Sequence, residues 1–168
     1  MHGAKPSLLG RVLMWVYGIL MFLAVPLAFL FYNHGGQRWL LYLGWVLVAA
    51  GVAINFAAGQ AFRAHGGVPE GKHIVFTTRL VDKGIYGIIR HPQYLGFISI
   101  VLGLVLVSQH WLTAICGVLG SLLFYLDVPN EERATADKFG EEYRRYMERV
   151  PGWNLLSGLL RSVRRRQG

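Results

Sequence analysis

Four long apolar stretches alternate with polar connections along this chain of 168 residues. Residues 12–32 contain no charged side chain, and residues 39–62 form a second stretch rich in glycine and alanine. Because a helix rises about 1.5 Å per residue, each is long enough to cross a bilayer. Residues 92–108 and 111–128 form the third and fourth stretches, and the short connection between them predicts an antiparallel helical hairpin.

Beyond the fourth stretch the pattern becomes amphipathic. Residues 152–168 combine a leucine-rich face with clustered arginines, which predicts a basic tail at the membrane interface. The pattern as a whole predicts one all-α domain over residues 1–168, a polytopic membrane protein with four transmembrane helices and amphipathic C-terminal helices. Within residues 127–151, apolar side chains at helical spacing predict a face that packs on the membrane or on the protein: Phe139, Tyr143, Tyr146, Met147 and Val150.

The distribution of charge predicts the orientation of these helices. The chain has 17 Lys and Arg against 9 Asp and Glu, and every basic residue except Arg38 falls on one side of the predicted membrane. By the positive-inside rule that side is the cytoplasm, and both termini lie there. Because the charges avoid the apolar stretches and cluster between them, we expect no nucleic-acid partner. We place the protein in the cytoplasmic membrane of a bacterium or an archaeon.

Composition supports the membrane assignment, since 54% of the residues are hydrophobic, only 15% are charged and the mean hydropathy is +0.38. Cys116 is the single cysteine, and it excludes an intrachain disulfide and a CxxC metal site. We therefore predict no metal site. The sequence makes no prediction of the oligomeric state.

Polar side chains gather at the cytoplasmic ends of the third and fourth stretches. Arg90 and His91 precede the third, and Glu131 and Glu132 follow the fourth. Each pair has a structural explanation, as positive-inside markers or as carboxylates in the first turn of a helix. Asp127 is harder to explain in this way, because an acidic residue near hydrocarbon is costly and usually has a partner.

Two segments carry a resemblance to a known family. They are LVDKGIYGIIRHPQYLG, from Leu80 to Gly96, and EERATADKFGEEYRRYMERVP, from Glu131 to Pro151. Together they resemble the integral-membrane isoprenylcysteine carboxyl methyltransferase and phospholipid methyltransferase family. The shared pattern is Gly-x-Tyr, then RHPxYxG, then Glu-Glu followed by Phe-Gly-x-x-Tyr. The resemblance covers residues 77–151, with site segments expected at 77–96 and 127–151.

The resemblance implies S-adenosyl-L-methionine as cofactor, S-adenosyl-L-homocysteine as product, and a lipid or isoprenoid-like acceptor from the bilayer. Glutamate suits the methionyl ammonium, arginine or histidine the carboxylate, and aromatic faces the adenine or sulfonium. We assign Glu131 to the ammonium and Glu132 to its support. The implied cofactor contacts are Leu80, Val81, Gly84, Tyr86, Arg90, His91, Tyr94, Glu131 and Glu132.

One departure from the family pattern concerns the acceptor. The prenylcysteine enzymes carry an arginine four residues before the first glutamate, where this chain has Asp127. A carboxylate would repel a prenylcysteine carboxylate and would suit an amine lipid better. Residues at i and i+4 share a helix face, so we expect Asp127 and Glu131 to face one cavity and to act in catalysis. The alternatives are that Asp127 pairs with a loop arginine and that the acceptor is a prenylcysteine.

Two other classes of function remain open at this stage. The sterol and enone reductases share an RHPxY-like stretch but use NADPH, and their closing segment has a pattern that this chain lacks. A non-enzymatic membrane adaptor would use the basic tail and would bind no cofactor.

Overall fold

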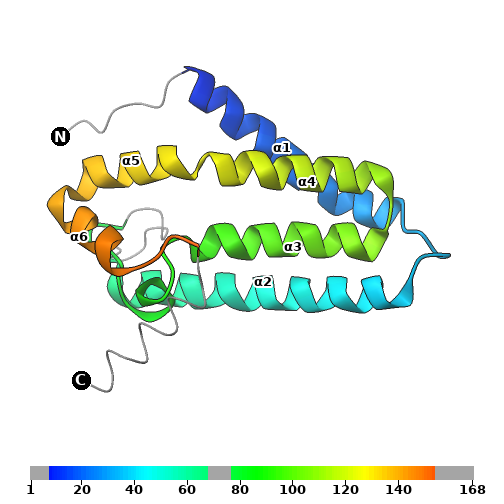
Figure 1. Ribbon diagram of the computed structural model, residues 1–168, viewed down its shortest axis with the longest axis horizontal. Helices are drawn as coiled ribbons and strands as arrows, with labels where there is room; N and C mark the ends of the chain where they lie inside the picture. The colour runs from blue at the N-terminus through cyan, green and yellow to red at the C-terminus, as the bar shows by residue number, and fades with distance from the viewer. Residues whose placement is uncertain (1–7, 68–76, 154–168) are drawn as a thin grey trace.

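The computed structural model describes residues 8–67 and 77–153, and the regular structure of these residues is helical. Helices α2, α3 and α4 lie side by side along the long axis, α1 crosses α4 obliquely, and the remaining elements gather at one end (Figure 1). The all-α prediction is confirmed. The elements are α1 (Leu8–Leu30), α2 (Arg38–His65), the 3₁₀ turn η2 (Gly84–Gly87), α3 (Pro92–Ser108), α4 (Trp111–Leu126), α5 (Val128–Phe139) and α6 (Glu141–Arg149).

Three helical stretches are long and apolar enough to cross a membrane. They are α1, α2 and the run Trp111–Phe139, which comprises α4 and α5. The apolar part of this run is α4, because α5 carries five charged side chains, so we place α5 outside the membrane. The predicted third span, α3, is a shorter apolar helix of 17 residues. The four-span topology therefore stays a prediction.

Glycines bring α2 and α3 into backbone contact. A Cβ atom added to Gly44 would lie 2.7 Å from the carbonyl oxygen of Gly103, and one added to Gly51 would lie 2.5 Å from that of Gly96. Because no larger residue fits these positions without a shift, the small residues of α2 have a packing role, as in other membrane helix pairs. This packing holds the N-terminus of α3, where the site begins, against α2.

The far end of the bundle confirms the predicted hairpin. Gln109 adopts a left-handed conformation with φ 49° and ends α3, and His110 caps α4 by accepting from the backbone N–H of Leu112. The Gln109 side chain also donates to the backbone oxygen of Gln37 at 2.9 Å. These bonds tie the α3–α4 turn to the start of α2.

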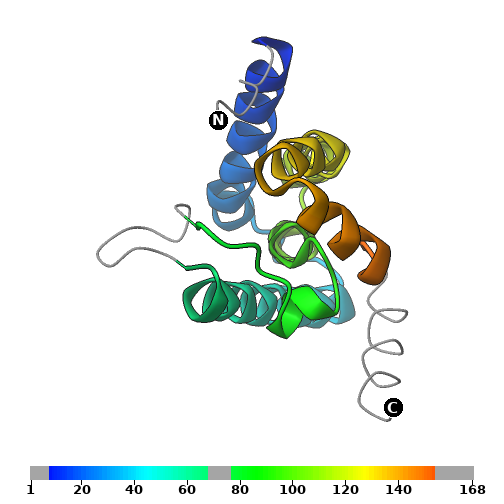
Figure 2. The ribbon, with the colours of Figure 1, turned by 90° about the vertical axis from the view of Figure 1, so that its left-hand side faces the viewer.

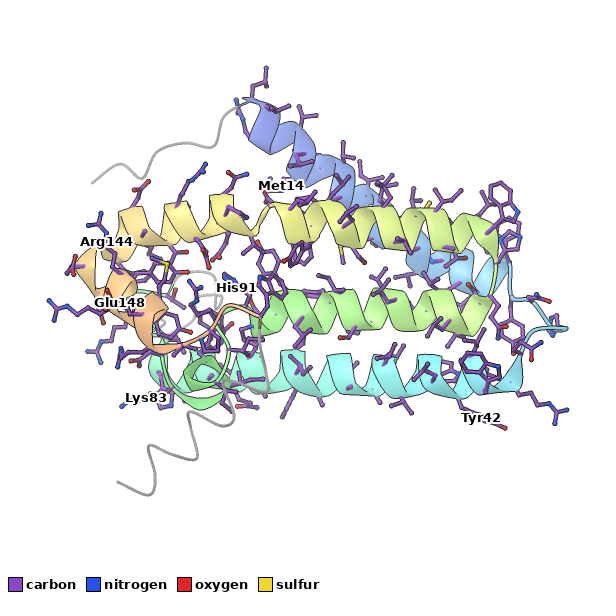
Figure 3. The ribbon with its side chains drawn as sticks, in the orientation of Figure 1. Met14, Tyr42, Lys83, His91, Arg144 and Glu148 are labelled. Carbon is purple, nitrogen blue, oxygen red and sulfur yellow. The ribbon has the colours of Figure 1, made fainter. Side chains whose placement is uncertain are left out.

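At the opposite end, α5 continues the line of α4, and α6 turns back across the ends of the other helices (Figures 1 and 2). The buried Tyr143, Tyr146 and Val150 form a small core with Leu80 and Phe139. The apolar face of the predicted amphipathic segment therefore packs on the protein. Figure 3 shows Lys83, Arg144 and Glu148 around this end and Tyr42 near the other.

Candidate active site

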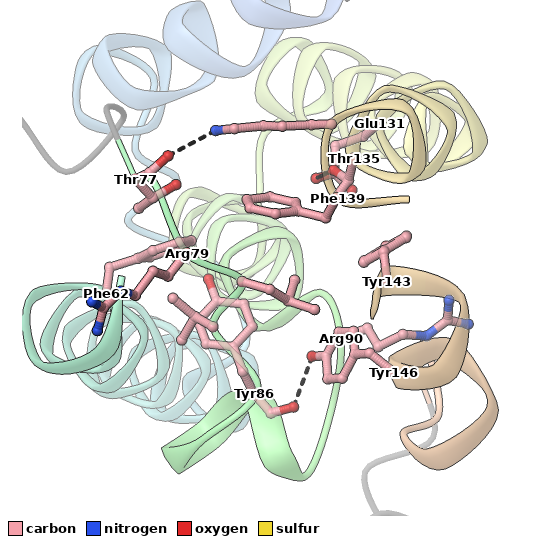
Figure 4. Close-up of a pocket in the computed structure, with 13 residues that line it drawn as sticks. Phe62, Thr77, Arg79, Tyr86, Arg90, Glu131, Thr135, Phe139, Tyr143 and Tyr146 are labelled. Atoms are coloured by element: carbon pink, nitrogen blue, oxygen red, sulfur yellow. Dashed lines mark hydrogen bonds between the residues drawn. The ribbon is translucent and has the colours of Figure 1, made fainter. Parts of the chain in front are cut away.

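A cavity of about 170 Å³ lies between the end of α2, the segment 77–90, α5 and α6 (Figure 4). One face of α5 forms one wall, because its lining residues follow helical spacing. The Lys138 ammonium donates to the carbonyl oxygen of Thr77 at 2.8 Å and joins α5 to the opposite wall. The cavity is lined by Phe62, Thr77, Arg79, Leu80, Val81, Tyr86, Arg90, Glu131, Thr135, Lys138, Phe139, Tyr143 and Tyr146.

Glu131 contributes a carboxylate oxygen that is buried and has no hydrogen-bond partner among the described residues. Its Oε1 accepts from the Thr135 hydroxyl at 3.0 Å. Its Oε2 lies 3.3 Å from His91 Nδ1, within ion-pair distance, and is buried without a hydrogen-bond partner among the described residues. Burial raises the pKa of Glu131, while the nearby His91 opposes this rise. A buried carboxylate oxygen without a partner is costly, so a cationic donor from a ligand would stabilise it.

Behind Glu131, the second glutamate organises Arg90 and His91. Glu132 Oε1 lies 2.8 Å from Arg90 Nη1 and 2.8 Å from His91 Nε2. The His91 side chain is only 3% exposed and lies between the two carboxylates. Arg90 Nε is buried without a hydrogen-bond acceptor among the described residues. Glu131 Oε2 and Arg90 Nε thus both lack a hydrogen-bond partner among the described residues, and both residues line the cavity.

Neutral aromatic side chains form much of the remaining wall. The Tyr146 hydroxyl donates to the carbonyl oxygen of Tyr86 at 2.7 Å, which ties α6 to η2. Burial, and then the charge of Glu131, raise the pKa of Tyr86 and of Tyr143 well above the usual range for a phenol. Burial also raises the pKa of Tyr146. These rings therefore offer uncharged faces suited to a planar base or a cation.

Trp153 is a neighbour of the site that the sequence did not indicate. It lies in the predicted basic tail, yet its ring stacks on His91 with centroids 5.6 Å apart and contacts Tyr125 at 4.8 Å. The backbone N–H of Arg90 donates to the carbonyl oxygen of Pro151 at 3.0 Å and holds this segment in place. Residues 154–168 of the predicted tail lie outside the described residues.

Asp127 does not line the cavity, contrary to the expectation from its spacing to Glu131. It ends α4 and precedes α5, and at this junction its side chain turns toward α1. Its Oδ2 accepts from the Tyr17 hydroxyl at 3.0 Å, and its Oδ1 accepts from Asn130 Nδ2 at 2.9 Å. Within the described part of the chain no arginine pairs with it.

The structure brings together most of the residues predicted for the cofactor. Five line the cavity: Leu80, Val81, Tyr86, Arg90 and Glu131. His91 and Glu132 lie directly behind them, and the Tyr94 ring contacts His91 edge-on at 5.7 Å. Gly84 opens η2 with φ +64° and is not among the lining residues.

Other lining residues were missed by sequence reasoning. Thr135 and Lys138 follow Glu131 at i+4 and i+7, and this spacing could have placed them on the same face of α5. Phe62 and Arg79 carried no such signal, because they come from segments that only the fold brings together.

Comparison with known proteins finds matches over the region that forms the cavity. The profile of a family described as phospholipid methyltransferase matches residues 39–142. Protein-S-isoprenylcysteine O-methyltransferase of Schizosaccharomyces pombe is 31% identical over 102 residues, 55% of this chain and 43% of that protein. The human protein of the same name is 32% identical over 126 residues, 67% of this chain and 40% of that protein.

A third relative has a different acceptor in its name. Methanethiol S-methyltransferase 1 of Bradyrhizobium diazoefficiens is 37% identical over 67 residues, 39% of this chain and 22% of that protein. The chain thus spans less than half the length of the curated relatives it matches. No solved structure matches it significantly. The profile match includes α2 to α5 and leaves α1 outside.

Proposed function

The chain belongs to the phospholipid methyltransferase family, and on this premise we propose that it transfers a methyl group from S-adenosyl-L-methionine to a lipid or lipid-like acceptor at the membrane surface. The observation that carries the proposal is Glu131 Oε2, a buried oxygen without a hydrogen-bond partner among the described residues, on a residue that lines the cavity near the start of α5. A buried acceptor of this kind is a place for a ligand ammonium.

The chemistry of the cavity fits the two ends of the methyl donor. Its methionyl end carries an ammonium and a carboxylate, which complement the Glu131 carboxylate and the Arg90 guanidinium; Glu131 Oε2 and Arg90 Nε each lack a hydrogen-bond partner among the described residues. The aromatic rings of Phe62, Tyr86 and Phe139 provide apolar faces for a planar adenine. We assign the backbone of Leu80, Val81 and Gly84 to the adenosine. His91, Tyr94 and Glu132 would hold the side chains of Glu131 and Arg90 in place.

When bound, S-adenosyl-L-methionine supplies a methyl group activated by a positively charged sulfur. The protein would then contribute mainly alignment of the two reactants and exclusion of water. His91 is fixed between Glu131 and Glu132 and is covered by Trp153, so it would help to align the reactants and to exclude water. An acceptor that arrives within the bilayer meets this site where α3 and α4 leave the membrane.

The acceptor class rests on Asp127. The named acceptors of the relatives differ, as they include isoprenylcysteine and methanethiol. In this chain a carboxylate without a cationic partner among the described residues stands at the end of α4. It suits a protonated amine headgroup, for which Asp127 would be counter-ion or base. A prenylcysteine carboxylate is the second candidate, supported by the similarity to the prenylcysteine enzymes.

Binding of S-adenosyl-L-homocysteine to the purified protein tests the donor assignment. Calorimetric titration should show saturable binding of this product and none of NADPH. Binding of NADPH alone would favour a reductase. Binding of neither compound would favour a membrane adaptor and would end the proposal.

The orientation of the protein follows from its charges. The end with the cavity carries exposed basic side chains such as Lys83, Arg144 and Arg145, so we place it in the cytoplasm with both termini. This orientation gives a cytosolic donor access to the cavity. It also fits the cytoplasmic membrane of a bacterium or an archaeon.

Cysteine labelling in intact cells measures this orientation. In a Cys116→Ser background, His34→Cys in the α1–α2 connection should react with a membrane-impermeant maleimide. Lys83→Cys, at the opposite end of the bundle, should react only after the membrane is permeabilised. Labelling of Lys83→Cys from outside intact cells would place the cavity in the wrong compartment and contradict the orientation.

A further inference from the structure

A polar bond joins α1 to the end of α4. Tyr17 is the one buried side chain of α1 that carries a polar group, since the other two are Ala24 and Ala28. Its hydroxyl donates to Asp127 Oδ2 at 3.0 Å, between residues 110 positions apart in the sequence. A buried phenol needs a hydrogen-bond partner, and here a carboxylate provides it.

The Asp127 carboxylate has two hydrogen-bond donors as partners and no cation among the described residues. Tyr17 and Asn130 each donate to one of its oxygens, and both are neutral groups. Neutral donors orient a carboxylate without neutralising it. A carboxylate with a purely structural role at the membrane boundary is expected to have a cation as partner, and Asp127 has none among the described residues.

Aromatic side chains connect Asp127 to the donor site. The Tyr17 ring contacts Phe124 with centroids 5.1 Å apart, and Phe124 stacks on Tyr94 at 4.1 Å. Tyr94 in turn contacts His91 edge-on, with ring centroids 5.7 Å apart. Tyr17, which holds Asp127, therefore belongs to the same aromatic cluster that borders the donor site.

We infer that Tyr17 is a positioning residue for the acceptor: its hydroxyl fixes the Asp127 carboxylate in the direction from which a lipid amine is recognised. This inference rests on the proposed function and adds α1 to the site. Since α1 lies outside the region matched by the family profile, it offers a means by which this chain sets its own acceptor preference.

Tyr17→Phe tests the inference, because it removes the hydroxyl and keeps the ring against Phe124. We expect affinity for S-adenosyl-L-homocysteine to stay within about twofold of wild type. Turnover on an aminophospholipid, measured as kcat/KM, should fall about tenfold or more, the size expected for loss of a hydrogen bond to a charged group. Tyr42→Phe, which removes a hydroxyl from an exposed side chain of α2, is the matched control and should leave both values unchanged.

A double variant separates positioning from a general structural effect. If Tyr17 acts through Asp127, Tyr17→Phe should cause no further loss in an Asp127→Asn background. Losses that multiply, or full turnover by Tyr17→Phe, would overturn the inference. Those results would leave binding of S-adenosyl-L-homocysteine intact, whereas failure of the wild type to bind it would overturn the proposed function and this inference together.

Discussion

Replacement of Glu131 by glutamine should weaken binding of S-adenosyl-L-homocysteine by about 1.5–3 kcal/mol, or roughly 10- to 150-fold. The reason is Oε2, which is buried without a hydrogen-bond partner among the described residues and belongs to a carboxylate that lines the cavity. Glutamine keeps the size of the side chain and its bond to Thr135 but removes the charge. Calorimetric titration of the purified protein measures the difference.

Glu148→Gln is the matched control for this prediction, because Glu148 is an exposed glutamate of α6 that is not among the residues lining the cavity of Figure 4. It should bind like the wild type. Unchanged affinity in a folded Glu131→Gln variant would remove Glu131 from the donor site. The ammonium would then need another partner, and Glu132 is already paired with Arg90 and His91.

Replacement of Asp127 by asparagine should preserve donor binding and reduce turnover on an amine lipid by about 100-fold or more, the range for loss of a positioned acid or base. The variant keeps an oxygen that can accept from Tyr17, so the contact between α1 and α4 is retained. What it loses is the charge that would attract the amine or accept its proton. A radiolabelled methyl donor with aminophospholipid vesicles measures the turnover.

A control variant and an alternative acceptor test whether the loss of turnover is due to the charge of Asp127. Asp137→Asn, at an exposed position of α5, should retain full turnover. Prenylcysteine analogues should be poor acceptors for the wild type, because Asp127 repels their carboxylate. Full amine turnover by Asp127→Asn, or efficient prenylcysteine methylation by the unmodified protein, would reject the assignment.

Most of the fold could be predicted because membrane helices leave a strong pattern in sequence. Pro92 suits the first turn of a helix, and the polar Gln109 and His110 interrupt the apolar run, so the bounds of α3 agree with the prediction. Helix α1 begins at Leu8, before the uncharged stretch of residues 12–32 from which the first span was predicted. A single Arg11 near a helix end does not stop the helix, since its long side chain can reach the membrane surface.

The site was predictable only where the sequence holds a local motif. Arg90, Glu131 and Tyr86 lie in such motifs, and the structure places all three at the cavity. Tyr17 and Trp153 do not, and their contacts to Asp127 and His91 depend on packing between distant segments. The direction of the Asp127 side chain could not be predicted either. Helical spacing does not reveal that this side chain turns toward α1 at the junction between α4 and α5.

Methyl transfer from radiolabelled S-adenosyl-L-methionine to membrane lipids is the most direct test of the proposed activity. Purified wild-type protein, reconstituted in vesicles that contain aminophospholipids, should transfer label to the lipid fraction, and S-adenosyl-L-homocysteine should inhibit the transfer. Glu131→Gln, assayed at a donor concentration that is limiting for the wild type, should transfer much less. Absence of label from every lipid fraction, with S-adenosyl-L-methionine bound and the protein folded, would contradict a lipid methyltransferase.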